Sequence, residues 1–229
     1  MKLTIWGAAR QVTGSMHLLQ TDNYSILIDC GLDYERDTWI EENEAFPFSP
    51  ADIDLVILTH AHIDHSGNLP TLIRFGFEGQ ILCTPATADL TELLLLDSVN
   101  IFLSKQRKRR RGKHGFSEGP KPLYLQKHVM ETVDRFVTIG FNKSFRINGQ
   151  INLTFIPVGH LLGAAAAVLS IEEHGDTKTI AFSGDIGRKN YPVLQDPESL
   201  PEVDYLVCES TYGGRNHKST QTVEELLTE

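Results

Sequence analysis

Residues 59–67 read Thr-His-Ala-His-Ile-Asp-His-Ser-Gly and hold three histidines and one aspartate within six positions. Imidazole nitrogens and carboxylate oxygens suit zinc and similar first-row ions. The apolar run 54–58 before them predicts a buried strand, and a loop leaving a strand can aim alternate side chains at one point and their neighbours at a second. The spacing therefore predicts a site for one or two metal ions. The alternative, that these residues cap a helix or lie on the surface, fits a single histidine better than this combination.

Two more predicted strand ends carry side chains of the same kind. His160 follows the predicted strand 150–157 and is flanked by glycines, which let the backbone approach a bound ion closely. With the first two histidines of residues 59–67 it makes three imidazoles, a set typical of catalytic zinc sites with an open position. Asp185 follows the predicted strand 177–182, and its carboxylate can place one oxygen on each of two cations.

Asp29 and Glu209 are further carboxylates at the ends of predicted strands, 24–29 and 204–208. From the residues alone, Asp29 is equally well a turn residue before Gly31, and Glu209 an ordinary residue at a strand end.

Together these motifs resemble a known family. Residues 59–67 look like the signature of the metallo-β-lactamase fold. Residues 7–15, Gly-Ala-Ala-Arg-Gln-Val-Thr-Gly-Ser, and 209–213, Glu-Ser-Thr-Tyr-Gly, narrow the resemblance to its β-CASP branch, which processes RNA and DNA. The resemblance implies an α/β protein with the metallo-β-lactamase αββα sandwich, incomplete at its C-terminal half.

The resemblance also implies roles for individual residues. The expected metal ligands are three histidines on the first ion, an aspartate and a histidine on the second, and a bridging aspartate: His60, His62 and His160; Asp64 and His65; Asp185. Asp29 is expected to support the ligand loop by accepting hydrogen bonds from it. Glu209 corresponds to a family residue that pairs with a histidine of the β-CASP domain. The expected catalytic residues are Asp64, Asp185 and Glu209.

The function implied by the resemblance is metal-dependent phosphodiester hydrolysis of RNA or another single-stranded nucleic acid. A hydroxide shared by two ions about 3.5–4 Å apart is the expected nucleophile. Zn²⁺, one ion or two, is the expected metal, and Mn²⁺ or Fe accept the same ligands. Two alternatives stay open: a metallo-hydrolase of small thioesters or lactones, and a non-catalytic module that binds RNA or protein.

The resemblance makes residues 1–208 the N-terminal portion of a metallo-β-lactamase domain and 209–229 the start of a truncated β-CASP region. In the family, the chain later returns and supplies a last histidine ligand to the second metal. We therefore expect a fragment of a longer nuclease, with a weak second metal site and impaired activity. Self-association through the unfinished core is a further expectation.

The chain has 229 residues, 41% of them hydrophobic, and a net charge of −9, which argues against a generally basic nucleic-acid binder. Its basic residues nevertheless concentrate after the predicted helix 85–103. This basic run reads as a solvated loop or as a contact to RNA phosphates. The candidate nucleic-acid contacts are Lys105, Arg107, Lys108, Arg109, Arg110, Arg111 and Lys113.

No apolar run approaches the ~20 residues that span a bilayer, and the start of the chain lacks the apolar stretch of a signal peptide. The sequence therefore predicts a cytoplasmic protein without a membrane partner. Cys30, Cys83 and Cys208 lie in apolar sequence and are predicted to be reduced core residues.

Overall fold

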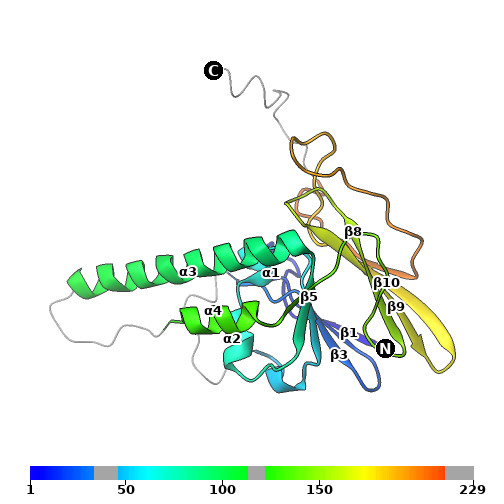
Figure 1. Ribbon diagram of the computed structural model, residues 1–229, viewed down its shortest axis with the longest axis horizontal. Coiled ribbons are helices and arrows are strands. Elements are labelled where there is room, and N and C mark those ends of the chain that lie inside the picture. Colours follow the sequence, from blue (N-terminus) through cyan, green and yellow to red (C-terminus); the bar gives the residue numbers. More distant parts are fainter. Residues whose placement is uncertain (34–45, 113–121, 215–229) are drawn as a thin grey trace.

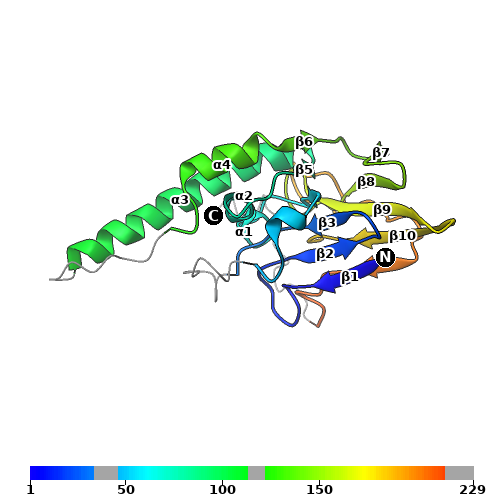
Figure 2. The ribbon, with the colours of Figure 1, turned by 90° about the horizontal axis from the view of Figure 1, so that it is seen from below.

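The computed structural model describes residues 1–33, 46–112 and 122–214, and for 105–112 it describes the backbone alone. In this part of the chain, two β-sheets pack face to face, and helices cover the outer side of one of them (Figure 1). The predicted α/β class is confirmed. The layers run helices, first sheet, second sheet (Figure 2).

The first sheet has six strands in the order β1-β2-β3-β4-β5-β6. They are β1 (Lys2–Ile5), β2 (His17–Gln20), β3 (Ser25–Ile28), β4 (Leu55–Ile57), β5 (Gln80–Cys83) and β6 (Phe136–Thr138). β1 to β3 are antiparallel, whereas β3 to β6 run parallel. β4 is buried along its whole length, as expected of a parallel strand covered on both faces.

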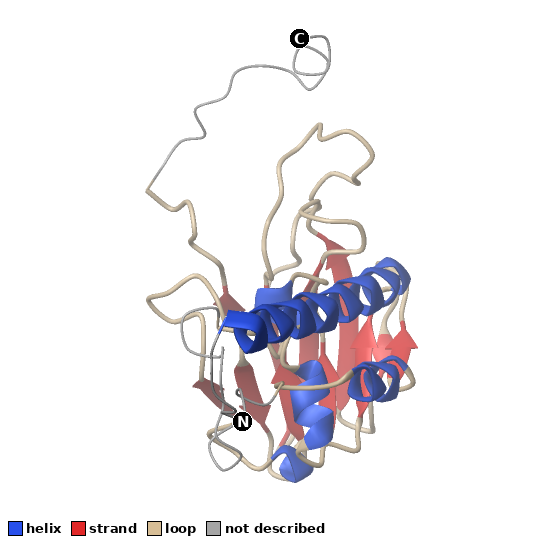
Figure 3. Ribbon diagram, turned by 90° about the vertical axis from the view of Figure 1, so that its left-hand side faces the viewer, coloured by secondary structure: helices blue, strands red, loops and turns tan. Residues whose placement is uncertain are grey.

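The helices lie on the outer face of the first sheet (Figure 3). They are the 3₁₀ turn η1 (Pro50–Asp52), α1 (Ile63–Ser66), α2 (Leu69–Arg74), α3 (Pro85–Gly112) and α4 (Gln126–Val133). Leu69 and Leu72 of α2 pack on Leu27 and Val56 of the sheet. α3 is attached through a smaller cluster that includes Leu95 and Val129. None of the described helices is long and apolar enough to cross a membrane.

The second sheet has the order β11-β10-β9-β8-β7. Its strands are β7 (Phe145–Arg146), β8 (Ile151–Pro157), β9 (Ala165–Glu173), β10 (Asp176–Phe182) and β11 (Tyr205–Val207). Neighbours are antiparallel except β10 and β11, which run parallel. The main core lies between the sheets, where Ile28 and Ile57 of the first meet Phe155, Leu169 and Phe182 of the second.

The outer face of the second sheet is covered differently. Ile156 and Ala166 pack there against Leu200, which belongs to the segment that runs between β10 and β11. The described helices all cover the first sheet, so the second helical layer of an αββα sandwich is not among the described residues. β11 forms the edge, and Tyr205 and Leu206 are about half exposed.

Two sequence predictions are wrong in detail. The helix predicted to end near residue 103 continues to Gly112, so the basic run from residue 105 onward lies largely on helical backbone and not on a loop. Lysine, arginine and glutamine are good helix formers, and they extend the helix where no apolar periodicity marks it. Cys208 is exposed, because it follows an edge strand, whereas Cys30 and Cys83 are buried as predicted.

Candidate metal centre

The candidate site lies where strands of both sheets end. Asp29 follows β3, residues 59–65 follow β4, His160 lies beyond β8, Asp185 beyond β10, and Glu209 beyond β11. The ends of β3 and β4 meet because these strands are parallel neighbours. Packing of the second sheet on the first then brings the ends of β8 and β10 to the same place, and Ala165 N donates a hydrogen bond to Thr59 O across the seam.

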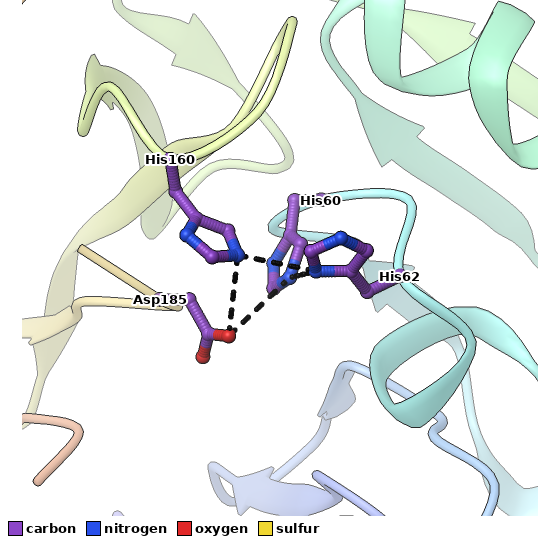
Figure 4. A group of neighbouring side chains, drawn as sticks. All are labelled: His60, His62, His160 and Asp185. Atoms are coloured by element: carbon purple, nitrogen blue, oxygen red, sulfur yellow. Dashed lines mark hydrogen bonds and ion pairs between the residues drawn. The ribbon is translucent and has the colours of Figure 1, made fainter. Parts of the chain in front are cut away.

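Three imidazoles and one carboxylate converge on one point (Figure 4). His62 Nδ1 lies 3.1 Å from His60 Nε2 and 3.1 Å from His160 Nε2. Asp185 Oδ2 lies 3.4 Å from His160 Nε2 and 3.8 Å from His60 Nε2. One ligand atom from each of the four residues lies within 4.8 Å of the others, so the cluster is consistent with binding a metal ion.

The protonation of these imidazoles favours a cation. Burial, aided by the neighbouring imidazoles, lowers the pKa of His60 well below 6.5. Burial and His160 lower the pKa of His62, although Asp64 and Asp185 act in the opposite direction. His60 and His62 are therefore neutral near pH 7, which is the form that binds a metal. Three imidazoles and a carboxylate match the donor number and chemistry of a tetrahedral zinc site, and the carboxylate leaves a negative charge for a cation to balance.

Asp29 supports the loop that carries the histidines. Its backbone is left-handed, with φ of 57°, a conformation that aspartate tolerates better than most residues. Its buried carboxylate accepts hydrogen bonds from the backbone N of Thr59 at 2.8 Å, from the Thr59 hydroxyl at 3.0 Å and from the Ser15 hydroxyl at 3.4 Å. It also contacts His65 Nδ1 at 2.7 Å. One carboxylate thus fixes the start and the end of the ligand segment.

His65 lies next to His60, with ring centroids 4.1 Å apart, and contacts the second oxygen of Asp185. Its Nε2 is 3.3 Å from Asp185 Oδ1, while Oδ2 of the same carboxylate faces His60 and His160. Burial alone lowers the pKa of His65, but Asp29 and Asp185 outweigh it and raise the value to about 10. Burial alone raises the pKa of Asp185, but the contact with His65 holds it below its usual value. Without metal, a proton therefore occupies the place beside Asp185 Oδ1.

Asp64 lies in α1 and is partly buried. Its charge acts on His62, and its backbone carbonyl accepts a hydrogen bond from Ser15 N at 2.8 Å. Asp64 is not a member of the four-residue cluster. Of the residues expected on the second metal, His65 contacts Asp185, but Asp64 does not join them in a group as close as the one expected on the first metal.

A family comparison identifies the fold that carries this site. The model of the metallo-β-lactamase superfamily matches residues 9–227. The chain belongs to the metallo-β-lactamase superfamily. This confirms the family predicted from residues 59–67, and the relatives below agree with its β-CASP branch.

The chain is 34% identical over 228 residues to "Ribonuclease TTHA0252" of Thermus thermophilus, covering 99% of this chain and 48% of the relative. It is 35% identical over 228 residues to "Transcription termination factor FttA" of Methanothermobacter thermautotrophicus, covering 96% and 32%. A solved metallo-β-lactamase of Cronobacter sakazakii is 24% identical with a TM-score of 0.45, covering 80% of this chain and 56% of that one. The chain spans less than half of the length of the ribonuclease and about a third of that of the termination factor.

Glu209 faces the same side of the site as Asp185. Its carboxylate accepts hydrogen bonds from the backbone N of Ile186 at 2.9 Å and of Thr211 at 3.1 Å. Its own backbone N donates to the Ser183 hydroxyl at 3.0 Å. A cavity of about 420 Å³ opens beside these residues and is lined by His65, Asp185 and Glu209 among others. Glu209 therefore holds the backbone next to Asp185 and lines the space beside it.

Sequence reasoning missed the hydroxyl groups that organise the site. Thr59 precedes His60 and Ser183 lies two residues before Asp185, whereas Ser15 is far from any predicted site residue in the sequence; their contacts with Asp29 and Glu209 join separate chain segments. The position of Thr59 directly before His60 is the one sequence feature that could have indicated a role for its hydroxyl. The candidate nucleic-acid contact Lys113 lies outside the described residues, as do the side chains of residues 105–112.

The other described histidines make contacts outside the four-residue cluster. His17 is buried and stacks on Phe182. His128 accepts a hydrogen bond from Leu125 N at the start of α4, and His174 is exposed and 3.0 Å from Asp22.

Proposed function

We propose that this chain is the metal-binding part of a metal-dependent phosphodiester hydrolase that acts on RNA. The observation that carries the proposal is the convergence of His60, His62, His160 and Asp185 at strand ends of a metallo-β-lactamase fold. The ribonuclease among its relatives supports RNA as the substrate class. Zn²⁺ is the proposed metal, with Mn²⁺ or Fe as alternatives that accept the same donors.

In this proposal each residue has one task. His60, His62, His160 and Asp185 would hold the first ion. His65 and Asp64 would contribute to a second position beside the other oxygen of Asp185, and Asp29 contacts His65 Nδ1 and orients its ring. A divalent cation bound there would stabilise the negative charge that develops on a phosphoryl group.

Glu209 favours a nuclease over a hydrolase of small thioesters or lactones. The small-molecule alternative predicts that the 209–213 motif turns away from the metal cluster. Instead, Glu209 lines the same cavity as Asp185 and hydrogen-bonds to the backbone of Ile186. We propose that Glu209 also contacts the substrate bound in this cavity.

The end of α3 is the proposed RNA contact. α3 extends past the rest of the described chain at its C-terminal end, where the sequence carries six of the seven candidate basic residues (Figures 1 and 2). A basic helical arm beside an acidic body attracts a polyanion locally through release of its counterions.

Hydrolysis of three substrate classes tests the proposal. The zinc- or manganese-loaded chain is given an aryl phosphodiester, a thioester and a lactone, with the His62→Ala variant as the background. We expect metal-dependent turnover of the phosphodiester alone, and only weak cleavage of RNA. Turnover of the thioester or lactone without phosphodiester turnover contradicts the proposal, and vigorous RNA cleavage contradicts the expected impairment.

Self-association through the unfinished core stays a prediction, and we propose β11 as the contact. β11 pairs with β10, but no described strand pairs with its outer edge, where Tyr205 and Leu206 are half exposed. We expect Leu206→Lys to shift the sedimentation coefficient toward that of a monomer.

A further inference from the structure

Thr59 occupies the point at which the two sheets and the ligand loop meet. Its side chain is buried, with 1% exposed. Its backbone N donates to Asp29 Oδ1, and its backbone O accepts from Ala165 N of β9. Two backbone hydrogen bonds therefore fix the position of Thr59, independently of the contacts of its hydroxyl.

The hydroxyl has three close polar neighbours. Thr59 Oγ1 lies 3.0 Å from each carboxylate oxygen of Asp29 and 3.1 Å from His60 Nδ1. A hydroxyl carries one proton, and a carboxylate can only accept. If the proton pointed to His60, three oxygens would face one another at these distances in a buried place, which is costly. The proton therefore points to Asp29, and Oγ1 accepts a hydrogen bond from His60 Nδ1–H.

This direction decides the state of His60. A neutral imidazole has one N–H, so a proton on Nδ1 leaves the lone pair on Nε2. Nε2 is the atom that faces His62 Nδ1 and Asp185 Oδ2. The ring of His60 is fully buried, so it is held in the orientation that this hydrogen bond sets.

Gly184 links Thr59 to the neighbouring ligand residue. Gly184 has φ of +54°, and a Cβ there would come within 3.0 Å of Thr59 Cβ and Oγ1. The absence of a side chain at Gly184 thus leaves room for Thr59, one residue before Asp185.

We propose that Thr59 is a positioning residue of the metal centre: its hydroxyl relays the charge of Asp29 to His60 and fixes the His60 tautomer that presents Nε2 to a cation. Asp29 then orients two imidazoles, His65 directly and His60 through Thr59. The inference rests on the proposed metal centre, and it assigns a role to a residue that binds no metal itself. Partners that orient a metal-bound histidine in this way change metal affinity by about 10–100-fold when removed.

The test uses two variants of Thr59 and one matched control. Thr59→Val keeps the shape and removes the hydroxyl, whereas Thr59→Ser keeps the hydroxyl. Thr71→Val is the control, because Thr71 is also 1% exposed and its hydroxyl has no hydrogen-bond partner among the described residues. Zinc affinity is measured by competition with a chromogenic chelator, and the fold of each metal-free variant is checked by its thermal unfolding.

We expect Thr59→Val to weaken zinc binding about 10–100-fold, Thr59→Ser to keep most of the affinity and Thr71→Val to leave it unchanged. Equal zinc affinity of folded Thr59→Val and the wild type overturns the inference. A wild type that binds no zinc contradicts the proposed function instead.

Nitrogen-15 NMR of the imidazoles in the metal-free wild type gives a second, independent readout. We expect the proton of His60 on Nδ1, and a shift toward Nε2–H in Thr59→Val. A proton on Nε2 in the folded wild type overturns the inference, even if Thr59→Val fails to fold.

Discussion

The two halves of the metal centre differ in how fully the described residues build them. At the first position, donors from the β4 loop and from the ends of β8 and β10 gather at one point. At the second, His65 and the other oxygen of Asp185 face each other, and Asp64 is not part of the close group. The first half is therefore prepared for a cation. The second must first lose the proton that Asp29 and Asp185 hold on His65.

Removing a first-position donor should have the largest effect. His160→Ala leaves two imidazoles and one carboxylate. Removing a residue that only orients a ligand lowers metal affinity about 10–100-fold, and we expect the loss of zinc affinity here to be larger. Competition titration measures it. His174→Ala is the control, because His174 is exposed in the turn between β9 and β10 and lies 3.0 Å from Asp22. Unchanged affinity in His160→Ala would place the metal elsewhere.

Asp29 should affect both halves, but less strongly. Asp29→Asn leaves the shape and removes the charge that Thr59 and His65 contact. We expect zinc affinity to fall about 10–100-fold, with both ions affected. Asp54→Asn is the control, since Asp54 accepts a hydrogen bond from Ser25 N at the opposite end of β3. If Asp29→Asn weakened the binding of one ion only, Asp29 would not support both metal positions.

The proton on His65 predicts a pH dependence of the metal-free protein. Because folding raises the pKa of His65 from 6.5 to about 10, its contribution to the free energy of unfolding is complete below pH 6.5. That contribution is lost as the pH rises toward 10. Chemical unfolding across this range should show the decline in the wild type but not in His65→Gln. Parallel pH profiles of the two proteins would mean that His65 is not charged in the fold.

The smallest effect concerns the basic run, which is remote from both halves. Neutralising Arg109, Arg110 and Arg111 to Gln should lower the slope of log affinity for single-stranded RNA against log salt by about 2. Zinc affinity should not change. Lys2, Lys143 and Lys178, all exposed on the strands and turns, form the control triple. An equal loss of slope in the control would indicate non-specific attraction.

The strand ends of the site could be predicted from the sequence, because an apolar run followed by histidine, aspartate or glycine marks the end of a buried strand from neighbouring residues alone. That reasoning singled out the four residues that the structure brings together, whereas the supporting role of Asp29 was implied only by the family resemblance. It did not find the hydrogen bond from Ile186 to Glu209 or the hydroxyl of Thr59 between Asp29 and His60, since each joins segments far apart in the chain. The length of α3 was missed because helix propensity alone, without an apolar face, extends it through the basic run.

Zinc binding to the wild type and to His62→Ala, measured side by side by calorimetry and metal analysis, tests the central claim most directly. His62 Nδ1 lies at the middle of the cluster, within 3.1 Å of both neighbouring imidazoles. We predict one tightly bound ion in the wild type, a second bound only weakly, and no tight ion in His62→Ala. Tight binding that survives in His62→Ala, or its absence from the wild type, would contradict the account.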